Sequence, residues 1–311
     1  MAEQSRASEL KFWLHVPLQT AHSEWLAPPN DGRLTILGYP CRLLAAVLPQ
    51  VPADMTGSPI AVRQYLLFDP LPESVARKLL DELVSRMPVL AFKEQVSYEI
   101  PNHAWVEKKE NHGVHNLTYP ALIVSHLEPK PASLGAHSKS TRGASDFLET
   151  KLAACPAVSD ERILAAIDLA NATKRESLAR SIFLSWLTII DSLATRKDRP
   201  ADIGAWLDEK IKEAEAKWKN DKGLQSALTG LKQESHGTAI RNLIGRAGQA
   251  LGESETQVKA RQGLAAKLYK TRSGLSHSGS KLQDPTEGSE ARDLARFLIE
   301  AAIQHPQILD D

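Results

Sequence analysis

An arginine and a histidine five residues apart are the side chains of this 311-residue chain best suited to chemistry. Arg272 and His277 lie in the segment KLYKTRSGLSHSG, at 267–279. The imidazole of a histidine titrates near neutral pH and can transfer a proton. The guanidinium of an arginine presents a fixed fork of donors that fits phosphate oxygens. The pair therefore indicates proton transfer beside a phosphate group.

The spacing of the pair constrains how its two side chains can meet. Five residues of an ideal α-helix turn through about 500°, which leaves the side chains about 140° apart. The motif is rich in residues that disfavour a helix: Ser273, Gly274, Ser276, Ser278 and Gly279. They indicate that the helix frays or ends here, and a second copy of the chain could also bring the two groups together. The competing interpretation is a basic helix end, where cations complement the helix dipole.

Two further features surround this motif in the sequence. Asp191 lies in the nearly apolar segment SWLTIIDSLA, at 185–194, where a half-buried carboxylate needs a partner. No acidic residue lies between Glu255 and Asp284, whereas six basic residues do: Lys259, Arg261, Lys267, Lys270, Arg272 and Lys281. Such a segment would attract phosphate, with Lys267, Lys270 and Lys281 as RNA-binding residues. The alternative is a solvated helix face, the usual position of charged side chains.

The pattern R-x4-H at a helix end, preceded by Tyr269, resembles the signature of the HEPN superfamily, most closely its ApeA-like branch. The segment 185–194 is similar to the family's apolar helix with an acidic residue before a leucine. The resemblance covers roughly residues 160–305. It implies a metal-independent endoribonuclease in which the 2′-hydroxyl attacks the neighbouring phosphate, leaving a 2′,3′-cyclic phosphate and a 5′-hydroxyl.

The resemblance also implies roles for individual residues and partners. Arg272 and His277 would be catalytic, Asp191 would orient one of them, and Ser273 would contact the phosphate or position the histidine. RNA would be the substrate, no cofactor would be needed, and two copies would pair with both motifs in one cleft. The family suggests a toxin or abortive-infection effector in prokaryotic defence, controlled by a regulatory protein or a trigger ligand.

Two alternatives remain open at this point. A helical module of this type could be non-catalytic, pair as a dimer, and bind nucleic acid, nucleotide or protein. It could also act as the partner of a nucleotidyltransferase, as some members of the family do. The role of His277 in proton transfer separates the ribonuclease from the first alternative.

Two domains with different local patterns are expected to position these residues. Residues 1–130 contain short β-like runs at 10–16, 33–38, 60–68 and 117–124, and one helix at 73–87, so we predict an α+β domain. The resemblance implies a sensor or regulatory role for this domain, because a ribonuclease needs control. A Pro-, Gly- and Ser-rich stretch predicts a linker at 131–155. Residues 156–311 predict an all-helical domain of five or six helices, at about 159–172, 175–194, 203–219, 224–251, 255–275 and 289–304.

Composition excludes several classes of protein. The formal net charge is zero, hydrophobic residues make up 42%, and two cysteines provide no disulfide framework. We expect a cytoplasmic protein without a signal peptide or membrane span.

His112 and His115, near Glu107 and Glu110, have no recognised metal spacing, so we do not expect a metal site. Trp13, Trp25 and Trp105 could stack on bases, although core packing is the favoured interpretation.

Overall fold

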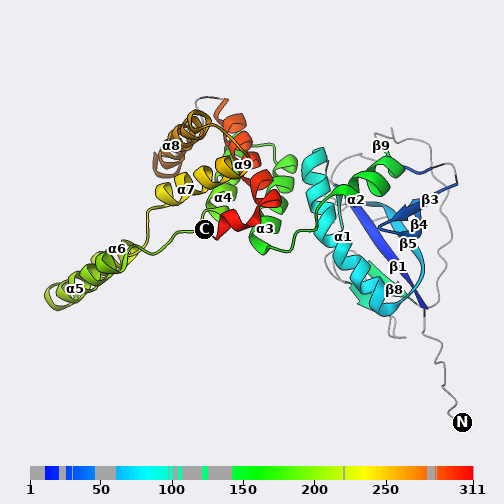
Figure 1. Cartoon of the computed structure of the whole chain (residues 1–311), viewed down its shortest axis with the longest axis horizontal. Helices are drawn as coiled ribbons and strands as arrows, with labels where there is room; N and C mark the ends of the chain where they lie inside the picture. Colours follow the sequence, from blue (N-terminus) through cyan, green and yellow to red (C-terminus); the bar gives the residue numbers. More distant parts are fainter. Residues whose placement is uncertain are drawn as a thin grey trace, which may run out of the picture. The chain divides into compact units, whose positions relative to one another are not determined.

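The chain divides into two compact units, Met1–Ser159 and Asp160–Asp311. The computed structural model describes residues 11–20, 26–29, 31–45, 61–96, 98–100, 104–106, 121–124, 142–219, 221–278, 284 and 286–310. The first unit contains a sheet and helices and the second contains helices (Figure 1). This order confirms the predicted α+β domain followed by an all-helical domain.

The sheet of the first unit has the strand order β3-β4-β5-β1-β8-β7, with β6 also paired to β1. Its strands are β1 (Lys11–Thr20), β3 (Arg33–Ile36), β4 (Tyr39–Ala45), β5 (Ala61–Pro72), β6 (Tyr98–Glu99), β7 (Ala104–Val106) and β8 (Ala121–Val124). The pairs are antiparallel except β7 with β8, which is parallel. Four of these strands match the β-like runs in the sequence.

One helix, α1 (Glu73–Glu94), packs against β1 and β5 in this unit (Figure 1). The alternate residues Leu14, Val16 and Leu18 of β1 are buried, because every second side chain of a strand faces the same side. The helix was predicted to end at Met87, yet it continues through Pro88 to Glu94, for about two more turns. The reason is that Val89 and the three residues after it are buried and hold the chain in the core.

The predicted linker at 131–155 is wrong for its second half. Residues 142–154 form β9 (Arg142–Gly143), a π-helix η1 (Ser145–Lys151) and α2 (Leu152–Ala154). Strand β9 pairs with β2 (Leu26–Ala27), and the ring of Phe147 lies 5.5 Å from that of Tyr98. The first unit therefore extends to Ser159 rather than to residue 130. Residues 131–141 of the predicted linker lie outside the described residues.

The second unit is built around α4 (Ala179–Leu193), which packs against α3 (Glu161–Ala172), α7 (His236–Ala250) and α9 (Thr286–Gln304). Six apolar side chains of α4 are buried there, as its apolar sequence predicted. Asp160 caps α3 by accepting from the backbone N–H groups of Arg162 and Ile163. The short segments η2 (Thr173–Arg175) and η3 (Pro306–Leu309) complete this core.

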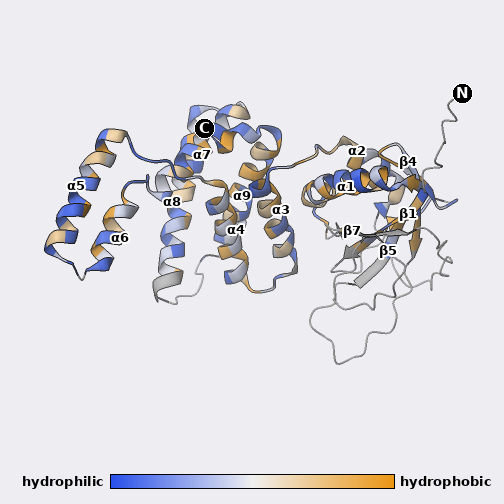
Figure 2. Cartoon of the chain, turned by 90° about the horizontal axis from the view of Figure 1, so that it is seen from below, coloured by the Kyte–Doolittle hydropathy of each residue, from blue (hydrophilic) through white to orange (hydrophobic). Residues whose placement is uncertain are grey.

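Three more helices belong to the second unit. They are α5 (Ala201–Lys217), α6 (Lys222–Gly230) and α8 (Glu255–Ser278). The helix predicted at 224–251 is divided into α6 and α7, so the described residues of this unit form seven α-helices, α3 to α9, rather than five or six. In Figure 2, α5 and α6 lie side by side and apart from the other helices of the unit. None of the helices in the described ranges is long and apolar enough to cross a bilayer.

Candidate functional site

The carboxylate of Asp191 connects α4 to α8. Its Oδ2 forms an ion pair with Nη1 of Arg272, and its Oδ1 accepts a hydrogen bond of 2.5 Å from the hydroxyl of Tyr269. Tyr269 and Arg272 are three residues apart on α8 and so share one face of that helix. The Arg272 guanidinium lies 5.6 Å from the centre of the Tyr269 ring. The structure thus brings together three residues singled out in the sequence.

Burial and a neighbouring charge keep the Tyr269 hydroxyl of this cluster protonated. The side chain of Asp191 is 19% exposed and that of Arg272 is 35% exposed. Burial raises the pKa of Tyr269 far above its usual value, and the neighbouring Asp191 carboxylate raises it further. The tyrosine therefore stays a hydrogen-bond donor, and Asp191 has two donors that hold it in place. The exposed part of the Arg272 fork can reach an anion.

His277 lies on the same helix as Arg272. Helix α8 runs without interruption to Ser278. The prediction that the helix frays or ends near Gly274 is therefore wrong for the residues up to Ser278. Gly and Ser weaken a helix by only fractions of a kcal/mol to about 1 kcal/mol each, and burial of Leu275 at 1% exposure anchors this turn. On a regular helix, the directions of residues 272 and 277 differ by about 140°. The side chains of Ser276, His277 and Ser278 lie outside the described residues.

Arg180 is a residue of this region that the sequence analysis missed. Its Nη2 donates a hydrogen bond of 2.9 Å to the backbone carbonyl of Leu275, two residues before His277. Arg180 and Asp191 are eleven residues apart on α4, which is three helical turns, so they lie on the same face. That spacing from Asp191 could have placed Arg180 on this face of α4, but it does not predict the hydrogen bond to Leu275. The contact ties the last turn of α8 to the first turn of α4.

His236 is a second residue near the cluster that was not predicted. It opens α7, directly after the capping Ser235, and its Nδ1 lies 3.9 Å from Oδ1 of Asp191. Its side chain is 56% exposed. This distance exceeds that of a hydrogen bond, so His236 is a neighbour of the site rather than part of its hydrogen-bond network.

Ser273 lies on α8 directly after Arg272 and is exposed. Successive residues of a helix point about 100° apart, and no hydrogen bond joins the Ser273 side chain to the residues that the structure describes. Ser273 therefore remains a candidate phosphate contact and does not belong to the Asp191 cluster.

The predicted basic surface is smaller than the sequence suggested. Acids from other turns and helices pair with three of its cations: Lys259 with Glu255 at 2.6 Å, Arg261 with Glu253 at 2.6 Å, and Lys267 with Glu290 at 2.8 Å. The hydrogen bond from Lys267 to Glu290 raises the pKa of that lysine and holds its charge beside an opposite one. Lys267 is thus a weaker candidate for RNA binding than its sequence position indicated.

Lys270 is an exposed lysine of the basic segment that lies close to the Arg272 motif in sequence. It forms no ion pair with any acid in the described ranges. Lys281 lies outside the described residues. The unpaired positive charge of the motif is therefore concentrated on Lys270 and on the exposed part of the Arg272 guanidinium, which lie about 200° of rotation apart around α8.

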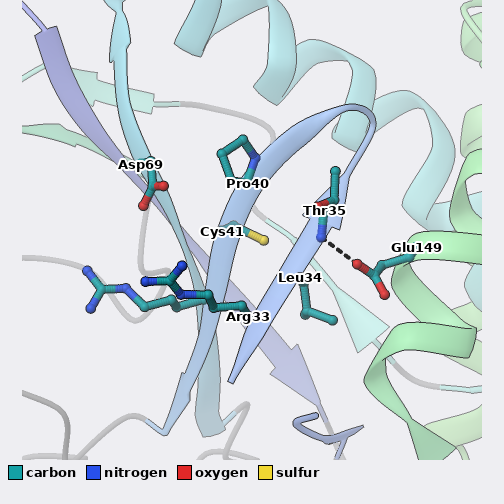
Figure 3. Close-up of a pocket in the computed structure, with 8 residues that line it drawn as sticks. Arg33, Leu34, Thr35, Pro40, Cys41, Asp69 and Glu149 are labelled. Atoms are coloured by element: carbon teal, nitrogen blue, oxygen red, sulfur yellow. Dashed lines mark hydrogen bonds between the residues drawn. The ribbon is translucent and has the colours of Figure 1, made fainter. Parts of the chain in front are cut away.

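The first unit contains a hollow of about 450 Å³ beside β3 and β4, lined by Arg33, Arg42, Cys41, Asp69 and Glu149 among others (Figure 3). Glu149 accepts a hydrogen bond of 2.5 Å from the backbone N–H of Thr35. Burial, aided by the nearby carboxylates, raises the pKa of Cys41 to about 12, so this side chain is a thiol and not a nucleophilic thiolate. The mixed charges of the hollow do not select one class of ligand.

The structure describes only some of the residues that the sequence offers for base stacking or metal binding. Trp13 is half-buried on β1 with the Arg42 guanidinium 5.8 Å from its ring, and it is not a fully buried core residue. Trp25, the side chain of Trp105, His112 and His115 lie outside the described residues, as do Glu107 and Glu110. Elsewhere in the described ranges, no group of three or more His, Cys, Asp or Glu is placed to hold a metal ion.

Comparison of the chain with protein-family models, with curated proteins and with solved structures found no match.

Proposed function

We propose that the second unit is a HEPN-type, metal-independent endoribonuclease in which Arg272 and His277 carry the reaction. The observation that supports this most is the anchoring of Arg272 by Asp191, in a helix that also carries His277. An arginine held by a half-buried carboxylate is set in one orientation before substrate binds, which is what stabilisation of a charged transition state requires.

The proposed role of Arg272 is to bind the phosphate under attack. A guanidinium has five N–H donors, and the pairing of Nη1 with Asp191 leaves most of them for phosphate oxygens. Asp191 and Tyr269 are positioning residues, because they act on substrate only through Arg272. Ser273 follows Arg272 directly and Lys270 lies two residues before it; both exposed side chains are proposed to contact the RNA backbone.

The proposed role of His277 is proton transfer. The 2′-oxygen of a ribose bonds to the adjacent phosphorus, the bond to the 5′-oxygen breaks, and one proton moves from the 2′-hydroxyl to the leaving oxygen. Imidazole can remove that proton or supply the replacement at neutral pH. The products are a 2′,3′-cyclic phosphate and a 5′-hydroxyl. Because residues 272 and 277 diverge on one helix, the reacting pair is proposed to combine Arg272 of one copy with His277 of a second copy.

A non-catalytic dimeric module that binds nucleic acid, nucleotide or protein is the second candidate. One observation favours it: acids within the same unit already pair with Lys259, Arg261 and Lys267, which reduces the attraction for RNA. In this alternative the Asp191–Arg272 pair would stabilise the packing of α4 on α8 and nothing more.

The wider role follows from the same proposal. A chain that cleaves RNA inside a cell needs control, so the first unit is proposed to act as a sensor or regulator that responds to a partner protein or a trigger ligand. A cytoplasmic toxin or antiviral defence effector is the role that the family resemblance suggests.

The experiment is incubation of the purified full chain with total RNA and with tRNA in the presence of EDTA. The proposal predicts cleavage that both Arg272→Ala and His277→Ala abolish. The matched control is Arg292→Ala, which removes an exposed arginine of α9 that pairs only with the exposed Asp293 among the described residues. Cleavage at the wild-type rate by both motif variants would contradict the proposal.

A further inference from the structure

Helices α5 and α6 form a hairpin that packs mainly on itself. Only Leu207 and Ala214 of α5 are buried, and no residue of α6 is. In both views of the chain the two helices extend away from the other helices of their unit (Figures 1 and 2). A two-helix hairpin buries too little apolar surface to be stable by packing alone.

The two segments that join this hairpin to the bundle are bonded to each other. Residues Asp198 and Gln233 form an antiparallel bridge between them. The Nε of Arg199 donates to the Leu231 carbonyl at 2.8 Å, and the Nε of Arg196 donates to the Glu234 carbonyl at 2.7 Å. These contacts close the base of the hairpin and hold α5 and α6 together as one unit.

Exposed apolar side chains are concentrated on the hairpin. Five large hydrophobic residues of the described chain are exposed, and four belong to the hairpin and its base: Ile203 at 37%, Trp206 at 55%, Trp218 at 47% and Leu231 at 50%. Clustered exposed apolar residues mark interaction surfaces. Tryptophan in particular contributes a large share of the binding energy where it is buried at an interface.

The charges of α5 indicate what covers this surface. Residues 201–209 contain three acids, Asp202, Asp208 and Glu209, and no basic residue. Residues 210–219 contain four lysines and two glutamates. A two-fold axis places the same patch of two copies face to face in opposite directions. Asp208 and Lys210 already pair with Lys232 and Glu213 of their own hairpin. Antiparallel pairing of two α5 helices would set the remaining acids of the first half, Asp202 and Glu209, against the remaining lysines of the second half.

We propose that the α5–α6 hairpin is a self-association surface through which two copies of the chain form a four-helix bundle, with their α5 helices antiparallel. This surface is separate from the Asp191–Arg272 cluster, and the proposal does not rest on RNA cleavage. Trp206 and Ile203, three residues apart on α5, form the apolar stripe of the interface, and the α5 charges set its direction.

The first test is analytical ultracentrifugation of the full chain from about 1 to about 100 µM. The proposal predicts a concentration-dependent dimer whose dissociation constant rises at least tenfold in Trp206→Glu. The matched control is Leu178→Glu, which alters the fifth exposed hydrophobic residue, 65% exposed and outside the hairpin, and should leave the dimer unchanged. A monomer at every concentration, or a dimer whose dissociation constant is unchanged in Trp206→Glu, would overturn the proposal; the second result would leave the pairing of copies through Arg272 and His277 in place.

Charge reversal tests the direction of pairing with exposed residues, so folding is not at risk. One variant carries Asp202→Lys with Glu209→Lys, and another carries Lys212→Glu with Lys217→Glu. Each alone sets like charges against each other and should lose the dimer, whereas an equimolar mixture should form a heterodimer. Homodimers of wild-type affinity in both variants would overturn the antiparallel arrangement.

Discussion

Asp191 and Arg272, 81 residues apart in the chain, are joined by an ion pair between Oδ2 and Nη1. The hydroxyl of Tyr269 donates a hydrogen bond of 2.5 Å to the other carboxylate oxygen, Oδ1. One acid at the end of α4 thus fixes the orientation of two side chains on α8. The proposed activity depends on this relationship, because it holds a partly exposed guanidinium in one place.

Removal of the carboxylate should destabilise the second unit. Asp191→Ala leaves Arg272 and the Tyr269 hydroxyl without their acceptor, so we expect the free energy of unfolding to fall by about 1–2 kcal/mol. Urea unfolding followed by circular dichroism measures this change. Asp293→Ala removes an exposed pair with Arg292 and should change it by less than about 0.5 kcal/mol. Equal effects of the two variants would show that the Asp191 pair contributes no more than a surface contact.

The raised pKa of Tyr269 predicts a specific loss of stability in alkali. The unfolded chain loses this proton near pH 10, whereas the folded chain keeps it to higher pH. The folded state then binds more protons, so the free energy of unfolding falls as pH rises above about 10. Tyr269→Phe lacks this part of the fall, although it is less stable near pH 8 by about 1 kcal/mol because the hydrogen bond to Asp191 is lost. Unfolding curves of both proteins from pH 8 to 11 test this, and parallel pH profiles would contradict it.

The buried His15 predicts that the first unit loses stability as the pH falls below 6.5. Burial lowers its pKa from 6.5 to about 4, its Nε2 has no hydrogen-bond partner among the described residues, and its ring stacks on Tyr65 at 5.9 Å. Between pH 6.5 and 4 the unfolded chain takes up a proton that the folded chain does not. The free energy of unfolding should therefore fall across this window, by about 3 kcal/mol in total. His15→Gln should flatten that part of the profile, and an unchanged slope would mean that His15 is solvated.

Mixing two inactive variants tests whether the site is shared between copies. Arg272→Ala retains His277, and His277→Ala retains Arg272. If each site takes one residue from each copy, a mixed dimer contains one intact site, and mixtures should recover about a quarter of the wild-type activity when subunits exchange at random. The mixed proteins would stay inactive if the pair acted within one chain.

Much of the fold follows from local sequence patterns. Helix α4 is predicted by its nearly continuous apolar residues, and its central position follows because such a helix must be buried on most sides. Strands β1, β3, β5 and β8 are predicted by short apolar runs between Pro and Gly. The need of Asp191 for a partner is also predictable, because a carboxylate among apolar residues must be compensated. The sequence left two partners open for Asp191, Arg272 and His277, and the structure pairs it with Arg272.

The rest depends on contacts that a single sequence does not reveal. The stretch between Glu255 and Asp284 contains no acid, yet Glu253 and Glu290 pair with its cations from outside it. Residues 142–154 are ordered by packing of Phe147 on Tyr98, which overrides a linker-like composition. Arg180 meets the Leu275 carbonyl across 95 residues, and no local pattern predicts that hydrogen bond.

The most direct test of the central claim is the rate of cleavage of one isolated tRNA in EDTA, with the ends of the products identified. The account predicts 2′,3′-cyclic phosphate and 5′-hydroxyl ends, and a loss of at least about 100-fold in His277→Ala because proton transfer contributes that much. His236→Ala, which alters the exposed histidine 3.9 Å from Asp191, should cleave within about threefold of wild type. Products with 3′-hydroxyl and 5′-phosphate ends, or cleavage by His277→Ala at the wild-type rate, would contradict the account.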